Sequence, residues 1–111
     1  MPEPSDSIPS KQDAQDTQND QGDEIRRRLM IMNKRGLHAR AAAKFVKLAG
    51  SFDAEINVHK SGNSVSGLSI MGLMMLAAAK DCHIEITSRG PQATEAMAAL
   101  EELIANRFEE E

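Results

Sequence analysis

The sequence predicts an α+β fold, a two-layer open-faced sandwich with a four-stranded antiparallel sheet and three helices on one face. Segments of alternating polarity and segments of helical spacing follow one another in the order β-α-β-β-α-β-α. Each helical segment has an apolar face, which must pack against a single sheet surface. The chain has 111 residues, enough for one small domain and not for two.

The first strand and the first helix are predicted in the first half of the chain. We predict a strand over residues 26–32, since this run ends at a turn over residues 33–36. A helix is predicted over residues 39–50, because apolar side chains recur there with helical spacing and Gly50 is suited to end it. The predicted buried face consists of Ala42, Phe45, Val46 and Ala49.

A β-hairpin is predicted next. Residues 53–60 alternate in polarity, which is typical of a strand with one buried face. The chain then turns tightly at residues 61–63 and returns as a short strand over residues 63–66. The side chains predicted to face the core are Ala54, Ile56 and Val58.

Two helices and one strand are predicted in the second half. Ser69 is a good N-cap, so a helix is predicted over residues 70–79. Gly72 weakens this helix by about 1 kcal/mol relative to Ala, which indicates close approach to another group. A strand over residues 82–88 and a helix over residues 92–107 follow. The buried stripe of the last helix is predicted to be Ala93, Ala96, Met97, Leu100, Leu103 and Ile104.

The helix after Ser69 has more apolar residues than one face can bury. Those predicted to enter the core are Leu73, Leu76 and Ala77. Those left over, predicted to form an exposed apolar patch, are Ile70, Met71 and Met74. Such a patch usually marks an interaction site, and Met suits a surface that meets several partners. Simple core filling is the alternative that helical periodicity leaves open.

The charge of the chain is divided unevenly along its length. Residues 1–24 hold seven acidic residues and one basic residue, for a net charge of −6, and have almost no apolar side chains. We expect them to form a disordered acidic tail, because they cannot bury enough surface to offset the ordering entropy. Residues 25–111 carry a net charge of +2 and form the expected domain, which suits an anionic ligand or an acidic partner.

Composition excludes several classes of protein. No apolar run is long enough to span a membrane, and the N-terminus lacks the apolar region of a signal peptide, so we expect a cytoplasmic protein. The single cysteine, Cys82, cannot form an internal disulfide. With three aromatic residues, the chain has no stacking platform for nucleic acid. His38, His59 and His83 lack the spacing of metal ligands, and we expect neither a metal nor a cofactor.

One histidine stands at a place suited to an anion. His38 precedes the first predicted helix, where the first backbone N–H groups are unpaired and the helix dipole is positive. Arg40 lies in the first turn and can form bidentate bonds to a phosphate or carboxylate. A histidine placed in this way could carry a phosphoryl group as phosphohistidine. Local spacing alone also permits an exposed histidine that only caps the helix. His59 and His83 have no such surroundings, and we interpret both as structural.

Two stretches of the chain resemble the HPr family, the phosphocarrier proteins of the bacterial phosphotransferase system. The first is "GLHARAAAKFVKLA", and the serine of "LSIMGLMMLAAAK" follows its histidine by 31 positions. The later stretch "IEITSRGPQATEAMAAL" is also similar to the family. The resemblance covers about residues 25–108, and the family's order of elements matches the predicted one.

The resemblance implies a role for each matched residue. His38 corresponds to the histidine that is phosphorylated on Nδ1, and Arg40 to the arginine that pairs with the phosphoryl group. Ser69 corresponds to the serine that HPr kinase/phosphorylase modifies in some bacteria, although a plain N-cap role is the alternative. The resemblance also implies a docking surface, in which we include Ile70, Met71, Met74, Lys44 and Lys47.

The resemblance further implies the partners. The phosphoryl group comes from phosphoenolpyruvate through Enzyme I and leaves to a IIA protein, so the chain is a monomeric carrier rather than an enzyme with its own small-molecule turnover. The alternative is a regulator of the same fold that acts through Ser69 and partner docking without phosphoryl flux. Many family members have proline where this chain has Ala41, and "GSFDAEI" and "GPQATEA" look similar to the nitrogen-related branch.

Overall fold

The computed structural model describes residues 24–110 and contains a four-stranded sheet of order β1-β4-β2-β3. Every pair of neighbouring strands is antiparallel. The strands are β1 (Glu24–Met30), β2 (Glu55–Lys60), β3 (Asn63–Ser66) and β4 (His83–Arg89). The predicted tail over residues 1–24 lies outside the described residues except for Glu24, which begins β1.

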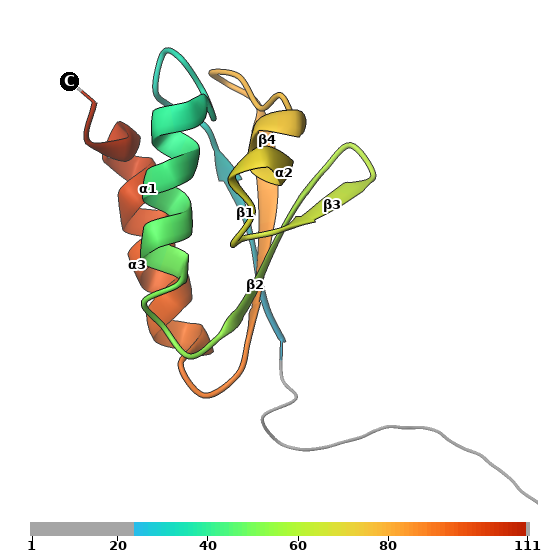
Figure 1. Ribbon diagram of the computed structural model, residues 1–111, viewed down its shortest axis with the longest axis vertical. Helices are drawn as coiled ribbons and strands as arrows, with labels where there is room; N and C mark the ends of the chain where they lie inside the picture. Colours follow the sequence, from blue (N-terminus) through green and yellow to red (C-terminus); the bar gives the residue numbers. More distant parts are fainter. Residues whose placement is uncertain (1–23, 111) are drawn as a thin grey trace, which may run out of the picture.

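The three helices cover one face of this sheet and leave the other face open (Figure 1). They are α1 (Ala39–Ala49), α2 (Ile70–Met75) and α3 (Ala93–Ala105), and a 3-10 helix, η2 (Arg107–Glu109), follows α3. Helices α1 and α3 lie side by side along the sheet, while the short α2 packs beside α1 over the β2–β3 hairpin. The predicted two-layer open-faced sandwich is confirmed.

The core between the layers is built almost entirely from aliphatic side chains. Strand β4 shows the expected alternation, with Ile84 and Ile86 buried toward the helices and His83 exposed on the open face. The last helix buries every residue of its predicted stripe. In α1, Phe45 is fully buried, whereas Val46 is only partly so. The predicted faces of the helices and strands therefore hold, with one exception in α2.

Helix α2 is shorter than predicted, because its last turn breaks at residue 77. Ala77 has a positive φ of 54°, and its N–H bonds to Met74 rather than continuing the α-helical pattern. The prediction that Ala77 enters the core is wrong: it is exposed, and Ala78 is buried in its place. The break turns the chain toward β4 and brings Ala78 to the loop before α1.

Several strand and helix ends also differ from the predicted ones: β1 ends at Met30 rather than at residue 32, and β2 begins at Glu55 rather than at residue 53. Strand β1 starts two residues earlier, at Glu24, because it pairs with β4 over the full register from Glu24 opposite Arg89 to Met30 opposite His83. Helix α3 ends at Ala105 rather than at residue 107, and the chain then enters the left-handed turn of η2. Alternation of polarity cannot give the limits of a strand, since they depend on its pairing partner.

Candidate functional site

His38 lies at the N-cap of α1, as predicted. Its backbone is extended, with φ −77° and ψ −179°, and its carbonyl accepts the first helical hydrogen bond from Ala42 at 2.8 Å. Its side chain makes no capping hydrogen bond, and the first turn of α1 contains no acidic residue. The first N–H groups of the helix therefore remain available to an anion beside the imidazole ring.

The loop before His38 is held against the end of the α2 segment. Gly36 has φ +66°, and a Cβ at this position would lie 2.3 Å from the carbonyl oxygen of Ala78, so only glycine fits. The next residue, Leu37, is buried and donates its N–H to the same oxygen at 2.9 Å. These contacts fix the backbone on which His38 stands.

The ring of His38 contacts a carboxylate from the far end of the chain. Nε2 of His38 is hydrogen-bonded to Oε2 of Glu110, and Asn33 Nδ2 donates to Oε1 of the same group at 3.0 Å. Only 15% of the His38 side chain and 21% of the Glu110 side chain are exposed. Neither Asn33 nor Glu110 is predicted from the sequence, and the terminal run of three glutamates gives no signal for this role.

The pKa of Glu110 is lowered from the ordinary value of a glutamate. Partial burial acts in the opposite direction, but it is outweighed by hydrogen bonds from Asn33 and His38 and by the positive charge of Arg35, to which His38 adds when its ring is protonated. Glu110 is therefore ionised at neutral pH and acts as a hydrogen-bond acceptor at both oxygens.

The segment that carries Glu110 is anchored in the core. Phe108 is fully buried, although its φ of 56° lies in the left-handed region, where a non-glycine residue is strained. Nζ of Lys44 donates to the carbonyl oxygen of Phe108 at 2.7 Å and lies 3.7 Å from the carboxylate of Glu109. Lys44, expected on the docking surface, thus holds the C-terminal segment, whereas Lys47 is exposed.

A cavity of about 520 Å³ adjoins this network, with Asn33 and Glu110 in its wall. Its lining is strongly basic. Six cationic side chains line it against the two carboxylates of Glu109 and Glu110; they are Lys34, Arg35, Arg40, Lys44, Lys80 and Arg107. Arg40, predicted to hold an anion, is exposed there, two residues after His38. The surroundings of His38 therefore favour phosphate or carboxylate ligands.

Ser69 caps α2, which confirms the predicted capping. Its Oγ accepts a hydrogen bond from the N–H of Gly72 at 2.9 Å. Gly72 also lies close to Val65, since an added Cβ would meet that side chain at 3.0 Å, and this explains the glycine. Around this cap lies an apolar surface that we call the α2 patch, formed by the exposed side chains of Leu68, Ile70, Met71, Met74 and Met75.

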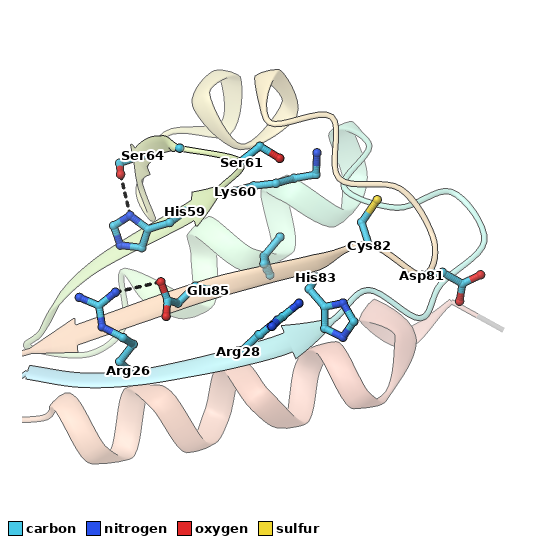
Figure 2. A pocket seen from close by; sticks show the side chains of 12 residues that line it. Arg26, Arg28, His59, Lys60, Ser61, Ser64, Asp81, Cys82, His83 and Glu85 are labelled. Atoms are coloured by element: carbon cyan, nitrogen blue, oxygen red, sulfur yellow. Dashed lines mark hydrogen bonds and ion pairs between the residues drawn. The ribbon is translucent and has the colours of Figure 1, made fainter.

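The other two histidines lie away from this site, on the open face of the sheet (Figure 2). His59 is held by Ser64 at 2.6 Å and Thr87 at 3.1 Å, and His83 lines the same shallow cavity. Arg26 in that cavity is paired with Glu85 at 2.8 Å. Within residues 24–110, no three potential ligands gather into a metal site, and none of the helices described there could cross a membrane.

Comparison with known proteins identifies the family to which the chain belongs. Residues 25–106 match the family model described as the PTS HPr component phosphorylation site. The chain belongs to the HPr family. It is 51% identical over 83 residues to the phosphocarrier protein HPr of Pseudomonas aeruginosa, with 74% of this chain and 92% of that protein covered. Identity to HPr of Cupriavidus necator is 48% over 86 residues, which covers 78% and 97% of the two chains.

A solved HPr structure matches the fold as well. The crystal structure of HPr-C-His from Thermoanaerobacter tengcongensis superposes with a TM-score of 0.75 at 39% identity and covers 78% of this chain and 98% of that one. The resemblance stated from the motifs is thereby confirmed at the level of the family, a phosphocarrier component of the phosphotransferase system. The matched region includes His38, Arg40 and Ser69, but not Glu110.

Proposed function

We propose that this protein carries a phosphoryl group on Nδ1 of His38, which it accepts from phospho-Enzyme I and passes to IIA proteins. One observation carries the proposal. Nε2 of His38 is engaged by Glu110, so Nδ1 is the ring nitrogen left for chemistry, beside the free N–H groups at the start of α1. Arg40 and the basic cavity next to the ring supply further positive charge for the phosphoryl oxygens.

The transfer itself needs little from the protein beyond placement and charge. The lone pair of Nδ1 attacks phosphorus as the bond from phosphorus to the donor nitrogen breaks, and that bonding pair stays with the donor. The helix N–H groups and Arg40 then receive the negative oxygens. Passing the group to an acceptor histidine reverses these steps, so the carrier is restored without net change.

We assign partner docking to the α2 patch, joined by exposed Lys47. Met71 is 70% exposed, and several apolar neighbours surround it on the same short helix. The hydrogen bond from Leu37 to Ala78 ties the segment after α2 to the loop of His38, so the patch and the histidine belong to one side of the domain. A partner seated on the patch can therefore present its own histidine to His38.

We propose in addition that Ser69 is phosphorylated by an HPr kinase/phosphorylase and that this blocks docking. Its hydroxyl is only partly buried and lies at a helix N-terminus, where a phosphate is tolerated. The added charge of about −2 would lie within the α2 patch and repel an acidic partner. The whole cycle would operate in the cytoplasm with a monomeric carrier.

A labelling experiment tests the carrier function. The purified protein is incubated with labelled phosphoenolpyruvate and Enzyme I, and we expect an acid-labile phosphate on the wild type. His38→Ala should abolish the label, whereas His59→Ala, the matched control on the open face, should keep it. Label that persists in His38→Ala would refute the assignment of His38. Absence of label on the wild type would favour a regulator that acts only through Ser69.

A further inference from the structure

We propose that Glu110 is a positioning residue for His38, which holds the imidazole in the tautomer that leaves the lone pair on Nδ1. This inference rests on the proposed carrier function and assigns to the C-terminal segment a part in it. The contact joins two groups 72 residues apart in the chain, and both side chains are largely shielded from solvent.

The direction of the hydrogen bond follows from the chemistry of the carboxylate. Ionised Glu110 can only accept, so Nε2 of His38 must carry the proton. In a neutral imidazole, the other nitrogen then has the free lone pair. Glu110 thus selects the nucleophilic state at Nδ1, although it does not touch the transferred phosphoryl group.

Asn33 fixes the orientation of Glu110. Asn33 is 1% exposed, and its Nδ2 donates to the carbonyl oxygen of Gly36 at 2.9 Å and to Oε1 of Glu110 at 3.0 Å. Both partners can only accept, so the amide nitrogen, not its oxygen, must face them. One carboxylate oxygen is therefore reserved for Asn33 and the other for His38, and the buried Phe108 anchors the segment.

The same contact also stabilises the charge that transfer creates. When Nδ1 bonds to phosphorus and the donor's bond breaks, the proton on Nε2 stays, so the ring becomes a cation next to the Glu110 carboxylate. Nearby cationic side chains repel the new positive charge on the ring. Those that line the cavity are Lys34, Arg35, Arg40, Lys44, Lys80 and Arg107. Glu110 and the exposed Glu109 are the acidic groups on that wall. The alternative is that Glu110 acts as an internal anion. Its carboxylate would then occupy the anion site beside His38 and slow the entry of the phosphoryl group.

Glu110→Gln separates these roles because it reverses the hydrogen-bond pattern. Asn33 still donates toward Oε1, so the new amide nitrogen faces His38 and favours a ring that accepts at Nε2 and carries its proton on Nδ1. We expect the side-chain nitrogen shifts of His38, measured by NMR at about pH 8.5, to move toward this Nδ1–H form. The initial rate of phosphoryl acceptance from Enzyme I should fall about tenfold or more. Glu102→Gln, which removes the same charge from an exposed side chain of α3 outside this cavity, should change neither.

The outcomes separate the positioning role of Glu110 from the carrier function of His38. If the wild type is labelled on His38 while Glu110→Gln alters neither the tautomer nor the rate, the positioning role is overturned and the carrier function stands. Faster acceptance in Glu110→Gln or Glu110→Ala would also overturn it and establish the internal anion. If His38 is not labelled in the wild type, the carrier function fails, but the nitrogen shifts still report whether Glu110 sets the tautomer.

Discussion

His38 and Asn33 form one hydrogen-bonded network with Glu110, which comes from a distant part of the sequence, and the three differ in whether the sequence predicts their roles. His38 and Arg40 can be predicted from the sequence because their roles depend on a local feature, the start of a helix. Asn33 and Glu110 cannot, since their contact depends on how the C-terminal turn folds back over the site. Local patterns thus identify the ring proposed to carry the phosphoryl group, and only tertiary structure identifies the groups that contact it.

The lowered pKa of Glu110 predicts a pH-dependent contribution to stability. A carboxylate whose pKa is lower in the folded state than in the unfolded state stabilises the fold above its unfolded pKa. That contribution is lost as the pH falls through the folded pKa. We expect the side-chain carbon shift of Glu110 to titrate with a midpoint below that of an ordinary glutamate, and Asn33→Ala to raise this midpoint. A midpoint at or above the ordinary value would contradict the network around His38.

For helix α2, the sequence pattern predicts where the helix begins but not where it ends. Its cap at Ser69 is predictable from residue type, and so is the excess of apolar side chains that form the α2 patch. Its end is not, because the helical spacing continues through Ala77, where the observed backbone turns left-handed. Packing of Ala78 against the loop of Gly36 determines that end, and a single segment cannot reveal such a contact.

Substitutions of Ser69 test the two functions of this helix end. Aspartate is as good an N-cap as serine, so Ser69→Asp should fold and unfold at the wild-type temperature but accept phosphate from Enzyme I several-fold more slowly, because its charge lies in the α2 patch. Ser69→Ala should lose about 1 kcal/mol of stability with near-normal transfer. Thermal unfolding and transfer kinetics measure both effects, and wild-type kinetics in Ser69→Asp would eliminate the proposed regulation.

The arrangement of layers explains why the fold could be predicted so fully. Each strand and helix has an apolar face, and one sheet with helices on a single side is the arrangement that buries these faces (Figure 1), while the surplus apolar side chains of α2 stay exposed. The position of the site was only partly predictable: the basic cavity combines the loop before α1, the loop after α2 and the C-terminal segment. The buried Phe108 in a left-handed turn gives no periodic signal, so the closing of the C-terminal segment over this cavity was not foreseen.

Direct observation of the phosphorylated nitrogen tests the central claim most sharply. After phosphorylation by Enzyme I and phosphoenolpyruvate, NMR of the protein labelled with nitrogen-15 can detect which ring nitrogen is coupled to phosphorus. We predict one phosphorus atom bonded to Nδ1 of His38, with the proton on Nε2 and the contact to Glu110 retained. Phosphorus bonded to Nε2 of His38, or to another residue, would contradict it.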